Sequence, residues 1–371
     1  PGCCVYSLEN NVVPGSGDQH RRSQGGGNCY PGSKTPDSIQ LIHSPDLQNN
    51  PVQSTMSTIH KKERCMRKHD VKFIVNPNAN LGRAWRLAAD LRPIMAEYGG
   101  ADWAGSVYPT HSIELTRQAV EEGYSLIIAG GGDGTVHEMI NAVMEYPPEK
   151  RPQIGVVPLG SGNDFASSLG MDPVPWKALR QIFNGKPRKV DVASIEDQFG
   201  RKEYCSNTIG IGFDAIVTIY SHQLPIVRGF MMYFTAVMKT IFLNHDPMRM
   251  DIVQDGEKSW KDDLLMLTIC NGGREGGGFQ LAPDSKIDDG ILDLVAVQQV
   301  SRLKMLGLIP RFIKGNHASD SKVVVDQFSE IKIQSDSPLY IHTDGEIFSG
   351  FSSNLKQIQV QIASRAVEFL C

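Results

Sequence analysis

The sequence predicts an α/β domain of the Rossmann type followed by an antiparallel β-sandwich domain, and three observations carry this prediction. Strand-like apolar runs alternate with helical patterns over residues 71–189, which is typical of a parallel sheet with helices on both faces. From about Val190 the pattern changes to short β-type runs separated by turns. The 371 residues, 40% of them hydrophobic, suffice for two domain cores.

Composition excludes several classes of protein. The net charge of −4 and the pI near 6.2 give no basic field, so we expect no nucleic-acid partner. The seven cysteines include no Cys-x-x-Cys pair, which favours reduced thiols in a cytoplasmic protein over a disulfide or zinc framework. The most apolar stretch, residues 224–243, is interrupted by Pro225, Arg228 and Lys239 and is not a membrane span.

Residues 1–69 differ from the rest of the chain. They are largely polar, with Gly, Ser, Asn, Gln and Pro common and little apolar periodicity, so they cannot bury enough surface to offset the entropy of ordering. The first methionine is Met56. We expect a disordered segment or one that does not belong to the native protein, with a regulatory arm as the alternative.

The α/β domain is expected to open with a strand at 71–75 and a polar turn at 76–80, at the sheet edge where open α/β folds place ligands. A helix over 82–98, a short strand near 106–108 and a helix over 112–122 follow.

The apolar run 126–129 then stops at three glycines followed by Asp133, Gly134 and Thr135, and a helical pattern begins. Glycines let backbone N–H groups and a helix N-terminus approach an anion closely. The bend therefore predicts a nucleotide-phosphate loop, although neither the Walker nor the G-x-G-x-x-G spacing is present. Thr135 is expected to cap the helix.

A second strand with a glycine bend follows at 154–157 and 158–166. Successive parallel strands end at the same edge, so we expect the two bends to converge on one crevice. Further on, β-type runs at 204–209, 264–270, 291–297, 331–333, 339–342 and 355–362 predict the sandwich. The helical stretch 227–243 carries a Met and aromatic stripe, for which core packing is the default and a lipid-facing role the alternative.

Five separated blocks resemble one family. They are GGGDGTVHE at 130–138, PLGSGNDFA at 158–166, NTIGIGFDA at 207–215, GGGFQLAPDSKIDDGILD at 276–293 and DGE at 344–346. Their order is similar to that in the soluble bacterial diacylglycerol kinases and related lipid kinases, a group that also holds NAD kinases and sphingosine kinases. The resemblance implies a nucleotide-binding domain at 70–189, a sandwich at 190–350 with the active site in the cleft between them, and a segment at 351–371 that returns to the first domain.

The resemblance also implies which residues contact ATP. They are Asn76, Pro77, Asn78, Ala79, Asn80, Thr110, Gly131, Gly132, Asp133, Gly134, Thr135, Val136, His137, Gly160, Ser161, Asn163 and Asp164. Two positions depart from the family pattern. Asn80-Leu81 stands where many relatives have glycine and a basic residue, which leaves Arg83 or another cation to face the phosphates. His137 stands where Asn is usual, and a helix-surface position is its alternative.

Phosphoryl transfer to a lipid hydroxyl benefits from a carboxylate that accepts the proton. Glu346 is the expected base because it follows the Asp344-Gly345 turn and matches the family's proton acceptor, whereas a plain hairpin turn is the alternative for that dipeptide. Asp133 is the second expected catalytic carboxylate, tied through water to a structural Mg²⁺. The resemblance places that ion on Asp289 and on the carbonyls of Lys286 and Ile291, hard oxygen ligands of the kind that Mg²⁺ prefers.

The sequence thus predicts an ATP- and Mg²⁺-dependent lipid kinase that phosphorylates diacylglycerol to phosphatidate. The expected partners are the lipid and, transiently, the inner face of the membrane, with a homodimer as a further option. Phosphatidylglycerol, a sphingoid base and ceramide are alternative acceptors, an NAD kinase is a more distant one, and a nucleotide-binding regulator without catalysis is the rival from another class.

Overall fold

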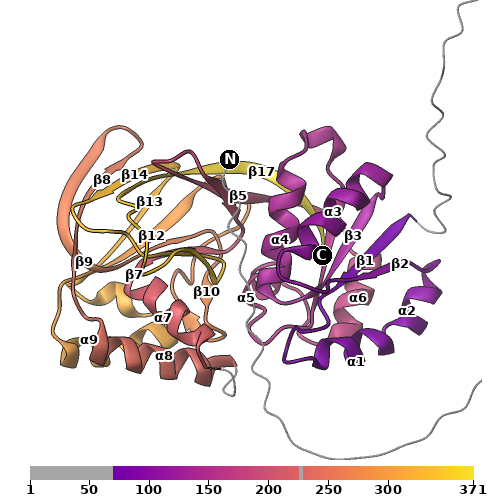
Figure 1. The fold of residues 1–371 in the computed structure, drawn as a ribbon, viewed down its shortest axis with the longest axis horizontal. Helices are drawn as coiled ribbons and strands as arrows, with labels where there is room; N and C mark the ends of the chain where they lie inside the picture. Colours follow the sequence, from indigo (N-terminus) through magenta and orange to yellow (C-terminus); the bar gives the residue numbers. More distant parts are fainter. Residues whose placement is uncertain (1–69, 225–228) are drawn as a thin grey trace, which may run out of the picture. The chain divides into compact units, whose positions relative to one another are not determined.

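The computed structural model describes residues 70–224 and 229–371, so the expectation for residues 1–69 lies outside the described residues. Figure 1 shows an α/β lobe and a sandwich lobe, which we define as residues 70–186 and 202–356. Two long strands, β5 (Pro187–Asp197) and β17 (Gln357–Leu370), join the lobes. Within the described residues, no helix is both long and apolar enough to cross a membrane.

The α/β lobe is built on a parallel sheet in the order β2–β1–β3–β4. Helices α3 and α4 cover one face, and α1, α2 and α6 cover the other (Figure 1). The strands are β1 (Val71–Val75), β2 (Asp102–Gly105), β3 (Leu126–Gly131) and β4 (Gln153–Pro158). The helices are α1 (Arg83–Asp90), α2 (Arg92–Glu97), α3 (His111–Glu122), α4 (Asp133–Met144), α5 (Asp164–Ser168) and α6 (Pro175–Asn184), with a 3-10 turn η1 (Pro148–Lys150).

Two local predictions for this lobe were wrong. The helix expected over 82–98 is two helices that meet at Leu91, because Pro93 has no N–H to continue the helical ladder and instead sits in the first turn of α2. The strand expected near 106–108 lies earlier, at β2, where it pairs with β1. Val107 and Tyr108 are exposed in the loop that follows.

The sandwich lobe is antiparallel and encloses an aliphatic core. Its strands are β6 (Lys202–Cys205), β7 (Thr208–Gly212), β8 (Met248–Gln254), β9 (Lys258–Cys270), β12 (Leu292–Gln298), β13 (Val323–Phe328), β14 (Glu330–Ser335), β15 (Ile341–Thr343) and β16 (Glu346–Ser349), with a separate hairpin of β10 (Arg274–Glu275) and β11 (Phe279–Gln280). The single run expected at 204–209 is divided, because the chain turns at Ser206 and Asn207 between β6 and β7.

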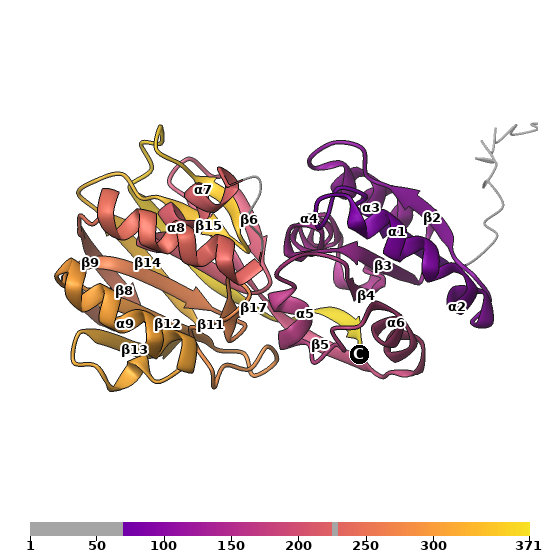
Figure 2. The ribbon, with the colours of Figure 1, turned by 90° about the horizontal axis from the view of Figure 1, so that it is seen from below.

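Three helices cover one face of the sandwich: α7 (Phe213–His222), α8 (Gly229–Leu243) and α9 (Arg302–Lys314), followed by the 3-10 turn η2 (His317–Ser319) (Figure 2). Of the predicted Met and aromatic stripe in α8, Ile241 is buried, Phe234 and Met238 are half-buried, and Met231 and Phe242 are exposed, so the core-packing interpretation is correct only in part. Its C-terminal residues Phe242 and Leu243 are exposed, so the helix also presents apolar surface to solvent. Residues 227 and 228 of the expected helical stretch lie outside the described residues.

Strand β17 connects the two lobes. It pairs with β14 in the sandwich and with β5 along most of its length, and Phe369 then pairs in parallel with Ile154 of β4. The Phe369 ring is fully buried against Phe165 of α5, with ring centroids 5.3 Å apart. The C-terminal strand therefore carries an aromatic anchor into the core of the α/β lobe.

Replacing this anchor tests its contribution to stability. Phe369→Ala should lower the free energy of unfolding by about 3–5 kcal/mol because it leaves a cavity in a closed core. Phe199→Ala, at a position that is 64% exposed, is the matched control and should have little effect. Urea unfolding of both variants measures the difference, and equal midpoints would contradict an anchoring role.

Candidate active site

The two glycine bends meet at the carboxyl ends of β3 and β4. Backbone N–H groups of Leu159 and Gly160 donate to the carbonyl of Gly131 at 2.9 and 3.1 Å. A β-carbon on Gly160 would clash with the backbone of Gly132, so both positions require glycine for this close approach. The convergence expected from the sequence is therefore observed.

Each bend is held by local hydrogen bonds. Asn163 has φ 58° and binds both the N–H and the carbonyl of Gly160, which closes the second bend on itself. Oδ1 of Asp133 accepts the N–H of Phe165 at 3.0 Å and so ties the first bend to the start of α5. The prediction that Thr135 caps α4 was wrong. Gly132 is the N-cap residue, and the buried Thr135 hydroxyl accepts from Asn76 instead.

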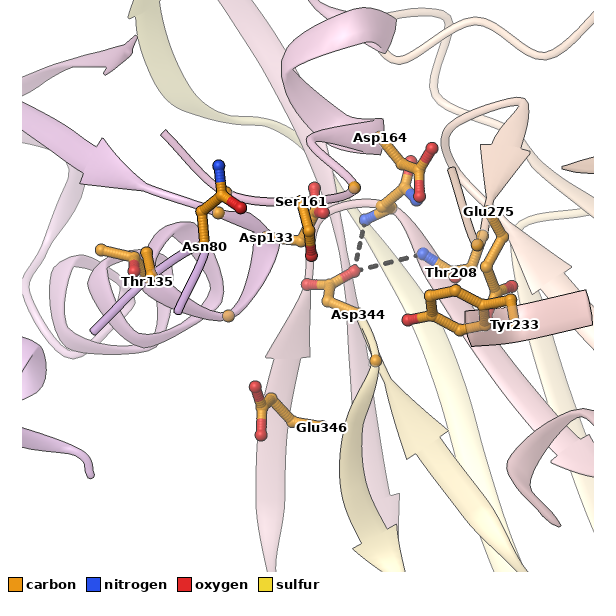
Figure 3. Close-up of a pocket in the computed structure, with 18 of the residues that line it drawn as sticks. Asn80, Asp133, Thr135, Ser161, Asp164, Thr208, Tyr233, Glu275, Asp344 and Glu346 are labelled. Carbon is orange, nitrogen blue, oxygen red and sulfur yellow. Dashed lines mark hydrogen bonds between the residues drawn. The ribbon is translucent and has the colours of Figure 1, made fainter. Parts of the chain in front are cut away.

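A cavity of about 280 Å³ lies at these bends and is lined by both lobes (Figure 3). Of the residues predicted to contact ATP, ten line it: Asn76, Ala79, Asn80, Gly132, Asp133, Gly134, Thr135, Gly160, Ser161 and Asp164. The others do not: Pro77, Asn78, Thr110, Gly131, Val136, His137 and Asn163. Thr110 is linked to the site indirectly, because its N–H donates to the lining residue Glu138 at 2.9 Å. Arg83 is exposed outside the cavity.

Glu346 reaches the cavity from the sandwich lobe. It follows the β15–β16 turn, in which Asp344 and Gly345 have φ angles of 51° and 85°. Its Oε1 lies so close to Gly134 that a β-carbon there would clash with it. The hairpin interpretation of Asp344-Gly345 is thus correct, and the same hairpin places a carboxylate against the first glycine bend.

Asp344 holds this hairpin in place. Its carboxylate accepts six hydrogen bonds, from His137 Nδ1, Cys205 Sγ, Ser206 Oγ and the backbone N–H groups of Ser206, Asn207 and Thr208. Burial alone would raise the pKa of Asp344, but these bonds, led by the one from His137, lower it. Because His137 belongs to α4, Asp344 links the α/β lobe to the catalytic turn.

His137 is buried and is not the helix-surface residue that the alternative described. Burial would lower the pKa of His137, but its hydrogen bonds to Asp344 and Glu203 raise the pKa to about 10. The side chain is therefore a cation at neutral pH, and its positive charge serves the contact between the lobes.

The comparisons with known proteins agree with this architecture. A model of the diacylglycerol kinase catalytic domain matches residues 70–195, and one of the YegS C-terminal NAD kinase beta sandwich-like domain matches residues 207–366. A protein of Chromohalobacter salexigens named "Probable lipid kinase YegS-like" is 35% identical over 238 residues, which are 63% of this chain and 73% of that protein. The chain belongs to the family of YegS-like lipid kinases and diacylglycerol kinases.

One further relative and one solved structure are also similar to this chain. The diacylglycerol kinase of Bacillus subtilis is 26% identical over 262 residues, 69% of this chain and 84% of that protein. A crystal structure of a diacylglycerol kinase from Bacillus anthracis has a TM-score of 0.61 at 21% identity and covers 81% of this chain and 96% of its own. The latter likeness concerns the fold alone.

The lining of the cavity is strongly acidic. Six carboxylates line it, from Asp133, Glu138, Asp164, Glu275, Asp344 and Glu346, and none of its described lining residues is Lys or Arg. Asp164 is 94% buried and its Oδ1 has no hydrogen-bond partner. Burial and the charge of Asp133 raise the pKa of Asp164 to about 7. Unpaired carboxylate oxygens of this kind are suited to hold a divalent cation.

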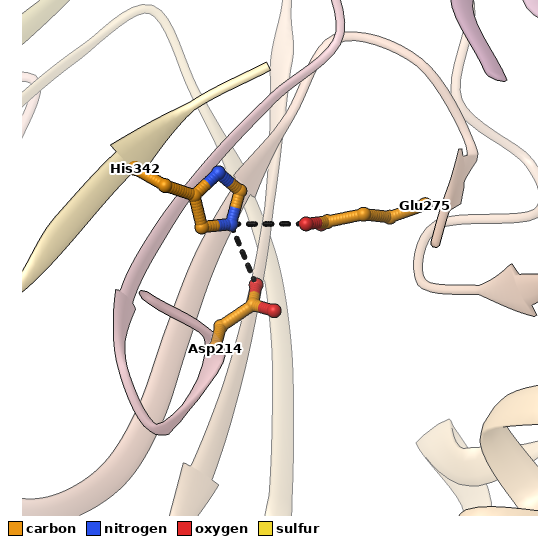
Figure 4. A group of neighbouring side chains, drawn as sticks. All are labelled: Asp214, Glu275 and His342. Carbon is orange, nitrogen blue, oxygen red and sulfur yellow. Dashed lines mark ion pairs between the residues drawn. The ribbon is translucent and has the colours of Figure 1, made fainter. Parts of the chain in front are cut away.

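Sequence reasoning missed several lining residues, chiefly Asn207, Thr208, His222, Tyr233 and Glu275. Glu275 belongs to a buried group with Asp214 and His342 (Figure 4). His342 Nε2 lies 2.9 Å from Glu275 Oε1 and 3.5 Å from Asp214 Oδ2. Such spacing could hold a metal. Burial would lower the pKa of His342, but Glu275 and Asp214 raise it to about 10, so the three side chains neutralise one another as an ion-paired group.

The expected magnesium loop lies outside the cavity, at residues 283–291. Oδ1 of Asp289 accepts the N–H of Ile291 at 3.2 Å. The buried Asp191 braces the loop by accepting from Gly290 N at 2.7 Å and donating its own N–H to Ile287. Burial raises the pKa of Asp293, and the charges of Asp289 and Asp284 add to this shift, whereas a hydrogen bond with Gln327 opposes it.

The contact between His137 and Asp344 should give the kinase a pH-dependent stability. Because the pKa of His137 is raised, its contribution is complete below the unfolded value of about 6.5 and is lost as pH rises toward 10. His137→Asn should therefore cost about 2–3 kcal/mol at pH 6 and less at pH 9. Thermal unfolding across this range measures the difference.

His317→Asn is the matched control for that experiment. His317 is also buried, but burial lowers its pKa, so its stabilising contribution is present above pH 6.5 and is lost as pH falls. The two variants should show opposite pH trends. Parallel trends would contradict the assignment of His137 as the charged partner of Asp344.

Proposed function

We propose that this family member transfers the γ-phosphoryl group of ATP to the hydroxyl of diacylglycerol, giving phosphatidate and ADP. The observation that carries the proposal is the position of the Glu346 carboxylate against Gly134 of the glycine bend. Nucleotide phosphates cradled by that bend would face a base supplied by the other lobe. Mg²⁺ would neutralise charge on the transferred group, which a cavity lined by six carboxylates requires.

In this scheme Glu346 accepts the proton of the acceptor hydroxyl as its oxygen forms the bond to phosphorus. Partial desolvation by the cavity walls raises the pKa of Glu346, which makes the carboxylate a stronger base. The nearby His222 opposes that shift. Asp133 and Asp164 would hold the cation that accompanies the phosphates, and the loop at Lys286, Asp289 and Ile291 would hold a structural Mg²⁺.

An apolar pocket adjoins the cavity and supports a lipid as acceptor. It lies among α7, α8 and α9, and its lining includes Val217, Val237, Met266, Leu281 and Phe312. Tyr233, Glu275 and Gly276 line both spaces, so an acyl chain in the pocket would bring its head group to the cavity. The space of about 50 Å³ holds only one or two water-sized groups, so a whole chain needs the packing of α8 to loosen.

The same helices suit contact with the inner face of a membrane. Phe242 and Leu243 of α8 are 60% and 62% exposed. Leu303, at the start of α9, is 81% exposed, and its neighbour Arg302 donates to the carbonyl of Ile241 in α8. The exposed side chains therefore belong to two adjoining helix ends, which would let the kinase reach a substrate that stays in the bilayer.

A panel of acceptors tests the proposed substrate. Purified protein would be supplied with γ-labelled ATP, Mg²⁺ and micelles of diacylglycerol, phosphatidylglycerol, ceramide or a sphingoid base, with NAD as a soluble acceptor. We expect label mainly in phosphatidate. A sphingoid base belongs in the panel because Asp214 and Glu275 border the apolar pocket and could pair with its ammonium group. Preferential labelling of another acceptor would reassign the substrate, and ATP binding without transfer would favour a regulator.

Glu346→Gln tests the proposed base. We expect kcat to fall by roughly 10²–10⁴ with little change in the KM for ATP, because the amide cannot accept the proton. Wild-type activity should rise with pH as Glu346 ionises above its usual value, and the variant should lose this dependence. Glu257→Gln, on an exposed turn, is the control. Unchanged activity of Glu346→Gln in a folded protein would refute the assignment.

A further inference from the structure

A second polar pocket shares no lining residue with the catalytic cavity, and none of its side chains is proposed to contact the reacting groups. Its volume is about 230 Å³. It is lined by Ser167 and Ser168 of α5, Arg188 of β5, Arg274 and Gln280 of the β10–β11 hairpin, and Ser285 and Lys286 of the following loop. We call it the rear pocket. Both lobes and one of the connecting strands contribute to it.

Strand geometry explains why the rear pocket and the catalytic cavity are separate. Arg274 and Glu275 are neighbours on β10, and successive side chains of a strand point to opposite faces. Glu275 lines the catalytic cavity, whereas Arg274 lines the rear pocket. The short helix α5 is divided in the same way, with Asp164 on the catalytic side and Ser167 on the rear side.

The lining of the rear pocket is cationic. Arg188, Arg274 and Lys286 line it, and no Asp or Glu is among its described lining residues. Arg188 is neutralised by Asp288, whose Oδ2 lies 2.8 Å from Nε. The ion pairs found among the described residues include neither Arg274 nor Lys286. The charge of Arg274 acts on Asp164 and that of Lys286 on Asp288, but neither cation forms a close ion pair, so both can still pair with a phosphate group.

Hydrogen-bond donors in the pocket are also left unpaired. Nη1 of Arg274 donates to Ser167 Oγ at 3.0 Å, which fixes the guanidinium plane, but its buried Nε has no partner. The buried Oγ of Ser285 has none either. A buried donor without an acceptor costs about 1–3 kcal/mol, and both donors belong to side chains that line the pocket. A guanidinium fork with nearby hydroxyls matches the geometry of phosphate oxygens.

We propose that the rear pocket binds a phosphate group, carried either by a phospholipid head group or by a soluble phosphate. The ligand would join Ser167 of the α/β lobe to Arg274 and Lys286 of the sandwich lobe. It would thereby hold α5 against the β10–β11 hairpin, which are already linked on the catalytic side by Gly277 N–H donating to Asp164 at 2.9 Å. Occupancy of the pocket would stabilise the arrangement of the active site without contributing a reacting group.

Binding of inorganic phosphate tests the pocket directly. Calorimetric titration of the full chain at constant ionic strength, with Mg²⁺ and a non-hydrolysable ATP analogue present in excess, would leave only sites outside the catalytic cavity. We expect Arg274→Gln to weaken phosphate binding roughly tenfold or more, since it removes a charge-assisted contact. Lys286→Gln should weaken phosphate binding as well. Because Lys286 is exposed, this substitution leaves the buried Arg274 guanidinium in place and should not disturb folding.

Arg249→Gln is the matched control, because Arg249 is an exposed arginine of β8 paired with Asp263. It should bind phosphate as the wild type does. Flotation with phosphatidylcholine vesicles, with and without phosphatidate, separates the two sources. If the protein floats with phosphatidate vesicles, if Arg274→Gln abolishes this flotation and if inorganic phosphate competes with it, the ligand is a phospholipid head group. If the protein binds soluble phosphate but does not float with the vesicles, the ligand is a free phosphate.

The proposal is overturned if both pocket variants bind inorganic phosphate as tightly as wild type, or if the wild type binds neither inorganic phosphate nor phosphatidate vesicles. These readouts measure binding and not turnover. A failure to phosphorylate diacylglycerol would therefore leave this test intact, and a failure here would leave the proposed reaction intact.

Discussion

The arrangement of the active site depends on the buried carboxylate of Asp344. Two oxygens accept six donors, which fixes the β15–β16 turn against the β6–β7 turn and against His137 of the other lobe. A carboxylate so fully satisfied tolerates burial at low cost, whereas loss of its partners would leave a bare charge inside the protein. Glu346 lies two residues further along the same turn, so the hydrogen bonds of Asp344 help to keep the Glu346 carboxylate against the glycine bend.

The second constraint is the excess of negative charge in the catalytic cavity. Nothing among its described lining residues supplies a fixed cation of the Lys or Arg type. In the proposed reaction, positive charge for the phosphates would come from metal ions and, more weakly, from helix N-termini such as that of α4. The rear pocket has the opposite character, with arginine and lysine and no carboxylate. The β10–β11 hairpin separates the two environments, because Glu275 of β10 lines the catalytic cavity and its neighbour Arg274 lines the rear pocket.

Sequence reasoning was most successful where short-range rules decide the structure. Apolar alternation located most strands, and the glycine bends were found because close backbone approach demands glycine at Gly132 and Gly160. The capping role expected of Thr135 failed because the helix begins earlier, at Asp133, with Gly132 as its N-cap residue. Glu275 and the environment of His137 depend on which strands and helices meet across the lobes, and no local pattern contains that information. The family's motif order supplied Glu346, which a hairpin signal alone would have left as a turn residue.

A structure of the protein with Mg²⁺ and a non-hydrolysable ATP analogue tests the central claim most directly. The account predicts that the terminal phosphate lies between the Gly132–Gly134 bend and the Glu346 carboxylate, with metal density at Asp133 and Asp164 and space beside Glu346 for an acceptor hydroxyl. A triphosphate bound elsewhere, or one whose terminal phosphate points away from Glu346, would contradict it.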